Sequence, residues 1–156
     1  MNKSYVIIPL IVAVAFLIFP FILYAGKMIM VVTSDSMLPV LKPYDMIVVE
    51  KASIDKANVG DIIVFDSHME GIGIVAHRAV EISDDHGRIG IDTKGDNVDE
   101  PDPWTVHDED FIGTVVSIAP SMGIFLVEPV RYGIVAVIII TAISLMREVM
   151  AKPKTA

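Results

Sequence analysis

Two serines placed two residues apart, Ser34 and Ser36, are the side chains of this chain that first suggest covalent chemistry. They lie within residues 33–39, shortly after an apolar segment that is long enough to cross a bilayer. A serine hydroxyl is a poor nucleophile unless a neighbouring group removes its proton. Histidine, which ordinarily titrates near pH ~6.5, suits that task close to neutral pH. The serine pair therefore predicts a nucleophilic site only if another segment supplies the base.

Four histidines are available as that base, and one of them lies in a strand-like pattern. His77 stands in the middle of residues 75–80, VAHRAV, where strand alternation would turn His77 and Arg78 to opposite faces. An isolated histidine in a strand is more often a packed or exposed bystander, so this position alone leaves its role open. The other three lie in polar, loop-like surroundings, where we expect surface positions: His68, His86 and His107.

An acidic segment follows at residues 93–104, TKGDNVDEPDPW. A carboxylate there could orient a histidine and stabilise its charged form, as in an arrangement of serine, histidine and aspartate. A plain acidic turn is the alternative, because Asp, Asn, Gly and Pro favour turns for local backbone reasons. A calcium loop that begins at Asp96 is disfavoured. Its sixth and twelfth places need glycine and glutamate but hold Pro101 and His107.

Composition narrows the classes of site that the chain can form. The 156 residues include no cysteine, which excludes structural disulfides, thiolate catalysis and cysteine-ligated zinc or iron–sulfur sites. We expect neither a cofactor nor a metal ion. Residues 26–131 contain 8 Lys and Arg against 19 Asp and Glu, a net charge of −11 within a chain of net charge −8. Nucleic acid is therefore not expected as a partner.

The N-terminal apolar run predicts a transmembrane helix. Residues 5–25 include 21 residues without a charge, about the ~20 that a span needs, and the chain as a whole is 53% hydrophobic. Pro9 and Pro20 are tolerated in a membrane helix. A cleavable signal sequence is the alternative reading. It fits less well, because the run exceeds the usual ~7–15-residue apolar core and no clear small-x-small cleavage site follows.

A second apolar run, residues 132–146, has 15 uncharged residues and predicts another transmembrane helix. A buried or interfacial helix is the alternative for so short a run. Arg147, Lys152 and Lys154 follow this run, and Lys3 precedes the first one. By the positive-inside rule, both termini are expected in the cytoplasm and the acidic middle outside.

The middle of the chain is expected to form a mainly β extracytoplasmic domain. Its short segments are rich in Val and Ile, and clusters of Asp, Gly, Pro, Ser or Asn separate them. We expect a hairpin tip at residues 83–87. The predicted strands cover residues 28–32, 46–49, 60–65, 74–80, 90–93 and 111–118.

These predictions give a chain of four parts. Residues 1–25 form a cytoplasmic tip and the first membrane helix, and residues 26–123 form the β-rich catalytic domain. Residues 124–146 form a membrane-proximal segment and the second membrane helix, and residues 147–156 a basic cytoplasmic tail.

Five motifs in this order, behind a membrane span, resemble type I signal peptidases. The resemblance is closest to the archaeal and endoplasmic-reticulum branch, whose base is histidine where typical bacterial enzymes have lysine. It extends from Ser34 to about Val116. The motifs are SDSMLP at residues 34–39, PYDMIVV at 43–49, GDIIVF at 60–65, HR at 77–78 and TKGDN at 93–97.

The resemblance implies a role for each candidate residue. Ser36 would be the nucleophile and His77 the general base, and the backbone N–H of Ser36 with the hydroxyl of Ser34 would form the oxyanion hole. The histidine-bearing relatives have two acidic positions six residues apart, matched here by Asp96 and Asp102. We expect Asp102 to orient His77 and Asp96 to support the site.

Three departures and one rival base accompany this match. Asp35 replaces the usual glycine between the serines, Tyr44 stands where glycine is frequent, and Val98 replaces a second asparagine. All the catalytic groups are kept, so these changes bear on substrate fit. Lys94 is the rival base, because it is the only lysine within a motif.

The implied protein is a membrane-bound serine endopeptidase with a signal-peptidase-like β fold. Its partners would be the lipid bilayer and secretory precursors, whose signal peptides end in small residues at the first and third positions before the cut. Accessory subunits are not indicated by the sequence. The rival from another class is a catalytically silent, membrane-anchored β-domain that binds a partner. A soluble, self-cleaving repressor-type peptidase is disfavoured by the two predicted spans.

Overall fold

The computed structural model describes residues 25–69, 71 and 73–151, together with isolated positions between residues 7 and 22. The chain divides into two compact units, one being Gly26–Ile124 and the other Met1–Ala25 with Phe125–Ala156. The predicted N-terminal span at residues 5–25 lies almost entirely outside the described residues, so it remains a prediction.

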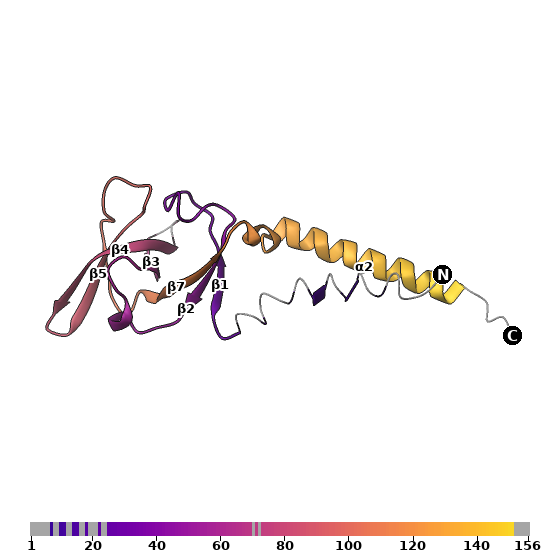
Figure 1. Ribbon diagram of the computed structural model, residues 1–156, viewed down its shortest axis with the longest axis horizontal. Helices are drawn as coiled ribbons and strands as arrows, with labels where there is room; N and C mark the ends of the chain where they lie inside the picture. The colour runs from indigo at the N-terminus through magenta and orange to yellow at the C-terminus, as the bar shows by residue number, and fades with distance from the viewer. Residues whose placement is uncertain are drawn as a thin grey trace. The chain divides into compact units, whose positions relative to one another are not determined.

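The unit Gly26–Ile124 is built on one antiparallel sheet of seven strands in the order β1-β2-β7-β3-β4-β5-β6 (Figure 1). This confirms the mainly β domain. The strands are β1 (Met28–Val31), β2 (Met46–Glu50), β3 (Ile62–Asp66), β4 (Ile74–Asp85), β5 (Arg88–Lys94), β6 (Thr105–Val106) and β7 (Phe111–Ala119). Two short 3-10 helices also occur, η1 (Ile54–Lys56) and η2 (Met122–Phe125).

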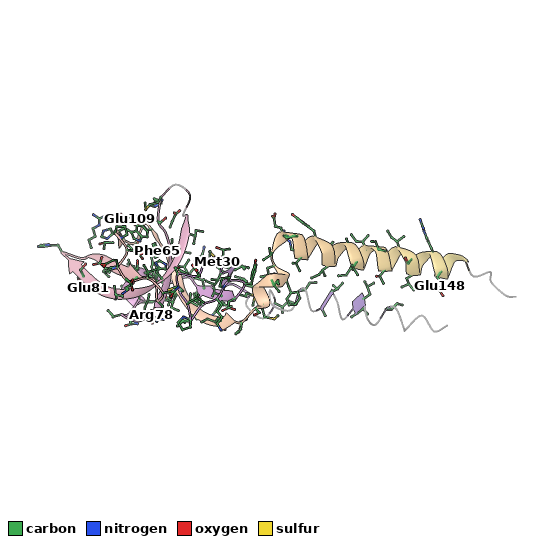
Figure 2. The ribbon with its side chains drawn as sticks, turned by 90° about the horizontal axis from the view of Figure 1, so that it is seen from above. Met30, Phe65, Arg78, Glu81, Glu109 and Glu148 are labelled. Atoms are coloured by element: carbon green, nitrogen blue, oxygen red, sulfur yellow. The ribbon has the colours of Figure 1, made fainter. Side chains whose placement is uncertain are left out.

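Strand β3 shows why the apolar runs of this domain are nearly continuous. Ile63 and Phe65 are fully buried in one hydrophobic cluster, whereas Val64 between them is fully buried in a second cluster. Side chains alternate across a strand, so apolar residues are needed on both faces. Burying each such side chain contributes about 1.5–3 kcal/mol. Phe65 lies within the dense group of side chains of this domain (Figure 2).

The β4–β5 hairpin is longer and its tip tighter than predicted. Residues 83–85 belong to β4, with Ser83 paired to Gly90 and Asp85 to Arg88. The predicted tip at 83–87 is confirmed, with narrower bounds, since the turn consists of His86 and Gly87 alone. Both have positive φ, 56° and 85°, as two-residue hairpin turns of the favoured hand require. Polar residues on an exposed hairpin arm carried no apolar signal that would extend the strand.

Strand β6 was not predicted. It consists of two residues only, Thr105 and Val106, which pair with Asp92 and Ile91 of β5. A pair this short has no periodicity that a sequence pattern could show.

Helix α2 (Glu128–Ala151) spans 24 residues and extends beyond the predicted apolar run 132–146 at both ends. At ~1.5 Å per residue it is ~36 Å long, enough for a hydrocarbon layer of ~30 Å. Pro129 stands in the first turn, where proline is tolerated. The stretch Glu128–Leu145 is long and apolar enough to cross a membrane by length and composition, and none of it is buried within the described protein.

Candidate active site

Three side chains from distant parts of the β domain meet in one hydrogen-bonded chain. The His77 Nε2 atom lies 3.0 Å from the Ser36 Oγ atom, across 41 positions of sequence. The His77 Nδ1 atom lies 2.6 Å from the Asp102 Oδ2 atom, across 25 positions. Ser36 comes from the loop after β1, His77 from β4 and Asp102 from the loop after β5.

The contacts of the His77 ring decide what each nitrogen can do. An ionised carboxylate only accepts hydrogen bonds, so Nδ1 must donate to Asp102. Nε2 of the neutral ring is then an acceptor, facing the Ser36 hydroxyl. The His77 residue is only 8% exposed and the Asp102 side chain 10%. This arrangement can remove the proton of a serine hydroxyl and stabilise the resulting imidazolium.

Asp102 is itself held by Thr93 of β5. The Thr93 hydroxyl donates to Asp102 Oδ2 at 2.7 Å, and the Asp102 backbone N–H donates to the Thr93 carbonyl oxygen at 2.9 Å. Thr93 is fully buried. No role for Thr93 is predicted from the sequence, although its place in the motif TKGDN at residues 93–97 was the available signal.

Lys94 follows Thr93 on β5 and is therefore turned to the opposite face of the strand. In the strand register it stands opposite Arg78. No described contact joins Lys94 to Ser36, whose hydroxyl lies against His77 and Ser34. The geometry thus favours histidine over lysine as the base.

Asp96 does not touch His77 but binds its neighbour, Arg78. The Arg78 Nε atom donates to Asp96 Oδ1 at 2.7 Å and the Nη2 atom to Oδ2 at 2.6 Å, a bidentate pair. A third hydrogen bond, from Nη1, reaches the Gly60 carbonyl oxygen at 2.7 Å. The hydrogen bonds that Arg78 donates to Asp96 raise the pKa of Arg78 above its ordinary value. The two acids of the sequence analysis thus have different partners.

The loop that carries Ser36 is tied to the segment around Asp45. Asp45 is buried, and its carboxylate accepts backbone N–H groups of Lys42 at 2.9 Å and Ser121 at 2.8 Å. Tyr44 has a φ of 70°, a left-handed conformation that glycine adopts most readily. The backbone requirement at this position accounts for the glycine that the resembling family often has there.

Ser34 lies beside the nucleophile candidate. Its Oγ atom is 3.3 Å from that of Ser36, and the residue is exposed. A hydroxyl in this place can turn toward an oxygen atom of a group bound at Ser36.

A comparison with protein families matches residues 2–120 to the family described as signal peptidase, peptidase S26. The chain belongs to the signal peptidase family. No curated protein matches the chain. Membership of this family implies serine peptidase activity on proteins that carry signal peptides, and an association with membranes.

A pocket of about 460 Å³ opens beside the proposed signal peptidase site. Ser34, Ser36 and His77 line it together with mainly apolar residues. The apolar lining comes largely from β1 and the loop after it and from the first part of β4: Met30, Val32, Leu41, Ile74, Val75 and Ala76. Such a lining suits small apolar side chains of a bound peptide.

The pocket follows a stretch of β4 that is paired on one side only. Residues 74–78 pair with β3, but β5 pairs with β4 only from Arg78 onward, where Lys94 is its partner. Among the described residues, the other edge of residues 74–77 has no strand partner. An extended peptide could add to this edge by backbone hydrogen bonds.

Trp104 forms part of the same pocket. Its ring packs edge-on against Phe65, with centroids 6.3 Å apart and an interplanar angle of 61°. The indole Nε1 atom is buried and has no hydrogen-bond partner among the described residues.

The remaining histidines lie away from the site. His68 is exposed and pairs with Asp110 at 2.8 Å, His107 contacts the Ile89 carbonyl oxygen at 2.9 Å, and His86 occupies the β4–β5 turn. Within the part of the chain that the structure describes, no group of three or more His, Asp or Glu side chains is placed to hold a metal ion.

Proposed function

We propose that this protein is a membrane-bound serine endopeptidase of the signal peptidase I type, from the histidine-bearing archaeal and endoplasmic-reticulum branch. It removes N-terminal signal peptides from secretory precursors. One observation carries the proposal: in a member of the signal peptidase family, Ser36 Oγ lies 3.0 Å from His77 Nε2, and His77 Nδ1 lies 2.6 Å from Asp102. This chain of contacts is what activation of a serine requires.

In the first half of the reaction, Ser36 Oγ attacks the carbonyl carbon of the scissile peptide while its proton passes to His77 Nε2. Asp102 stabilises the imidazolium that forms. The tetrahedral intermediate collapses when the C–N bond breaks, and His77 gives its proton to the leaving amine. The signal peptide is then joined to Ser36 by an ester bond.

In the second half, water replaces the amine. His77 takes a proton from the water, the hydroxide attacks the ester carbonyl, and the proton returns to Ser36 Oγ as the ester bond breaks. In both halves the negative charge develops on the carbonyl oxygen. The Ser36 N–H and the Ser34 hydroxyl are the proposed donors to it, and the loss of one such donor typically costs ~10²–10³ in rate.

The substrate binds along the unpaired edge of β4. A signal peptide bound as an extended strand at residues 74–77 turns alternate side chains to the same side. The first and third residues before the cut therefore enter the pocket together, against its Val, Leu and Ile walls and the Trp104 ring. This placement agrees with the two positions at which the resemblance implies small residues.

The membrane arrangement follows from α2 and the sequence. The apolar stretch of α2 is unburied within the described protein, as expected for a helix that faces lipid. With the predicted span at residues 5–25 and basic residues beyond both spans, the two termini are cytoplasmic and the β domain lies outside. Ten residues separate Ala25 from Ser36, at most ~36 Å of extended chain. Cleavage therefore takes place close to the membrane surface.

Processing of a secretory precursor by the purified full-length chain in liposomes tests the proposal. Ser36→Ala should abolish processing, because the ester cannot form. Ser53→Ala is the matched control and should leave it unchanged, since Ser53 is exposed and its side chain makes no capping hydrogen bond. Undiminished processing by Ser36→Ala would support instead the catalytically silent binding domain.

A further inference from the structure

Asn97 holds the loop of the proposed nucleophile at two adjacent carbonyl groups. Its backbone N–H donates to the Ser36 carbonyl oxygen at 2.8 Å. Its side-chain Nδ2 atom donates to the Asp35 carbonyl oxygen at 3.2 Å. The same oxygen accepts the backbone N–H of Leu38 at 3.1 Å, a bond within the nucleophile loop, so Asn97 supplies the second donor, from outside that loop. Asn97 and Asp35 are 62 positions apart in the sequence, so the hydrogen bonds of Asn97 join two distant segments of the chain.

The Asp35 carbonyl belongs to the same peptide group as the Ser36 N–H. A trans peptide group is planar and rigid, so its C=O and N–H bonds point in opposite directions and rotate together. A donor that holds the Asp35 oxygen therefore also fixes the direction of the Ser36 N–H. That N–H is the backbone donor of the proposed oxyanion hole. A hydrogen bond to the carbonyl also polarises the group and strengthens the N–H as a donor.

The turn that presents Asn97 is itself fixed beside His77. Its neighbour Asp96 makes the bidentate pair with Arg78, the residue after His77. A Cβ atom at Gly95 would lie 2.7 Å from the Ser36 carbonyl oxygen and 3.3 Å from His77 Nε2, so the turn can approach this closely only with glycine there. Asn97 is thus anchored to the strand that carries the base.

We propose that Asn97 is a positioning residue, which acts by holding the Asp35–Ser36 peptide group so that the Ser36 N–H points at the developing oxyanion. The inference rests on the proposed peptidase function. It assigns Asn97 no contact with substrate and no part in proton transfer. Its effect should therefore appear in the transition state and not in substrate binding.

Steady-state kinetics of Asn97→Ala test this assignment. We expect kcat to fall about 10- to 100-fold, less than the ~10²–10³ for complete loss of an oxyanion donor, with KM within about twofold of wild type. The kcat of Asn97→Asp should fall further. Its carboxylate cannot donate a hydrogen bond and would repel the Asp35 carbonyl oxygen. Asn97→Ala should not move the acid limb of the pH profile, since it changes no charge and leaves the contacts of His77 intact.

Asn58→Ala is the matched control. Asn58 also donates from Nδ2 to a backbone carbonyl oxygen, that of Lys56, at the same 3.2 Å, but it lies on the loop before β3. It should retain wild-type kcat and show a thermal shift similar to that of Asn97→Ala.

A peptide aldehyde of the signal-peptide sequence gives a second readout, because its adduct with Ser36 carries the oxyanion. The affinity for the aldehyde should weaken in Asn97→Ala by about the same factor as kcat, while the affinity for the matching peptide alcohol stays unchanged. Combined with Ser34→Ala, the losses should not multiply fully, since both residues serve one oxyanion.

Two outcomes separate the hypotheses. Wild-type kcat or wild-type aldehyde affinity in Asn97→Ala, with an active wild-type enzyme, would overturn the role of Asn97 and leave the peptidase function standing. A wild-type protein as inactive as Ser36→Ala would overturn the proposed function itself.

Discussion

His77 Nε2 lies 3.0 Å from Ser36 Oγ. Lys94, on the adjacent strand β5, is turned to the face opposite that of Thr93. The contact between His77 and Ser36 joins a strand and a loop that are 41 positions apart in the sequence. We therefore propose that an imidazole, and not a lysine amine, carries the proton. The choice of base has consequences for both mutants and pH.

Replacement of His77 should be far more damaging than replacement of Lys94. We expect His77→Ala to lower kcat by at least 10³-fold, because both proton transfers lose their carrier, and Lys94→Ala to keep more than about a third of it. Precursor cleavage should be lost in acid, because a protonated imidazole cannot accept the Ser36 proton. Full activity of His77→Ala together with inactivity of Lys94→Ala would show that the base is the lysine.

The two acids should be separable by mutation. Asp102→Asn removes the acceptor for His77 Nδ1–H and is expected to lower kcat by about 10³–10⁴-fold with little change in KM. Asp96→Asn breaks the bidentate pair with Arg78 and should chiefly lower the melting temperature, with a smaller loss of kcat. The assignment of Asp102 as the orienter would be wrong if Asp96→Asn were the more damaging of the two.

Thr93 should contribute through Asp102 alone. Thr93→Val keeps the shape but removes the hydroxyl that donates to Asp102 Oδ2 at 2.7 Å. Loss of a buried hydrogen bond to a charged group costs about 1.5–3 kcal/mol. We expect a lower melting temperature and a fall in kcat of about tenfold at constant KM, and Thr93→Ser should restore both. Equal activity of Thr93→Val and wild type would show that Thr93 does not contribute to catalysis through Asp102.

Trp104 should limit the size of the side chain that the pocket accepts. Its ring is a wall of the pocket, so Trp104→Leu adds space while leaving an apolar contact for Phe65. We expect precursors with valine in place of alanine before the cut to gain about tenfold in relative kcat/KM, the scale of a few methyl groups in an apolar pocket. Trp104→Phe keeps an aromatic ring and adds less space, so it should give a smaller gain. An unchanged ratio in Trp104→Leu would place the size limit elsewhere.

Much of the β domain could be predicted because its central strands β2 and β3 are buried on both faces. Val64 and Phe65 serve different clusters, and this leaves a continuous apolar run that the sequence displays. The outer ends of β4 and β5 and the whole of β6 were not predicted for the opposite reason. Residues at the hairpin end are mostly exposed, and β6 has only two residues. A strand could be predicted from the sequence where its side chains are buried, because burial requires apolar residues.

The candidate site was predictable in its residue types but not in its pairings. Strand alternation predicts that His77 and Arg78 face opposite sides of β4. It does not predict that Asp102 contacts His77 or that Asp96 contacts Arg78. That division depends on the path of the loop after β5. The contacts of Asn97 with the nucleophile loop depend on the same turn, and no periodic pattern encodes them.

The position of the C-terminus provides a test of α2 as a membrane span. In sealed right-side-out vesicles, a tag fused after Ala156 should resist added protease while the β domain is digested, because the tail is predicted to be cytoplasmic. Ile140→Asp places a charge in the middle of α2, at a cost of about 2.5–3.5 kcal/mol for insertion, and should expose the tag. Val59→Asp, an equally exposed branched residue of the β domain, should leave the tag protected. A tag that is digested in the unmodified protein would instead assign α2 to the membrane surface.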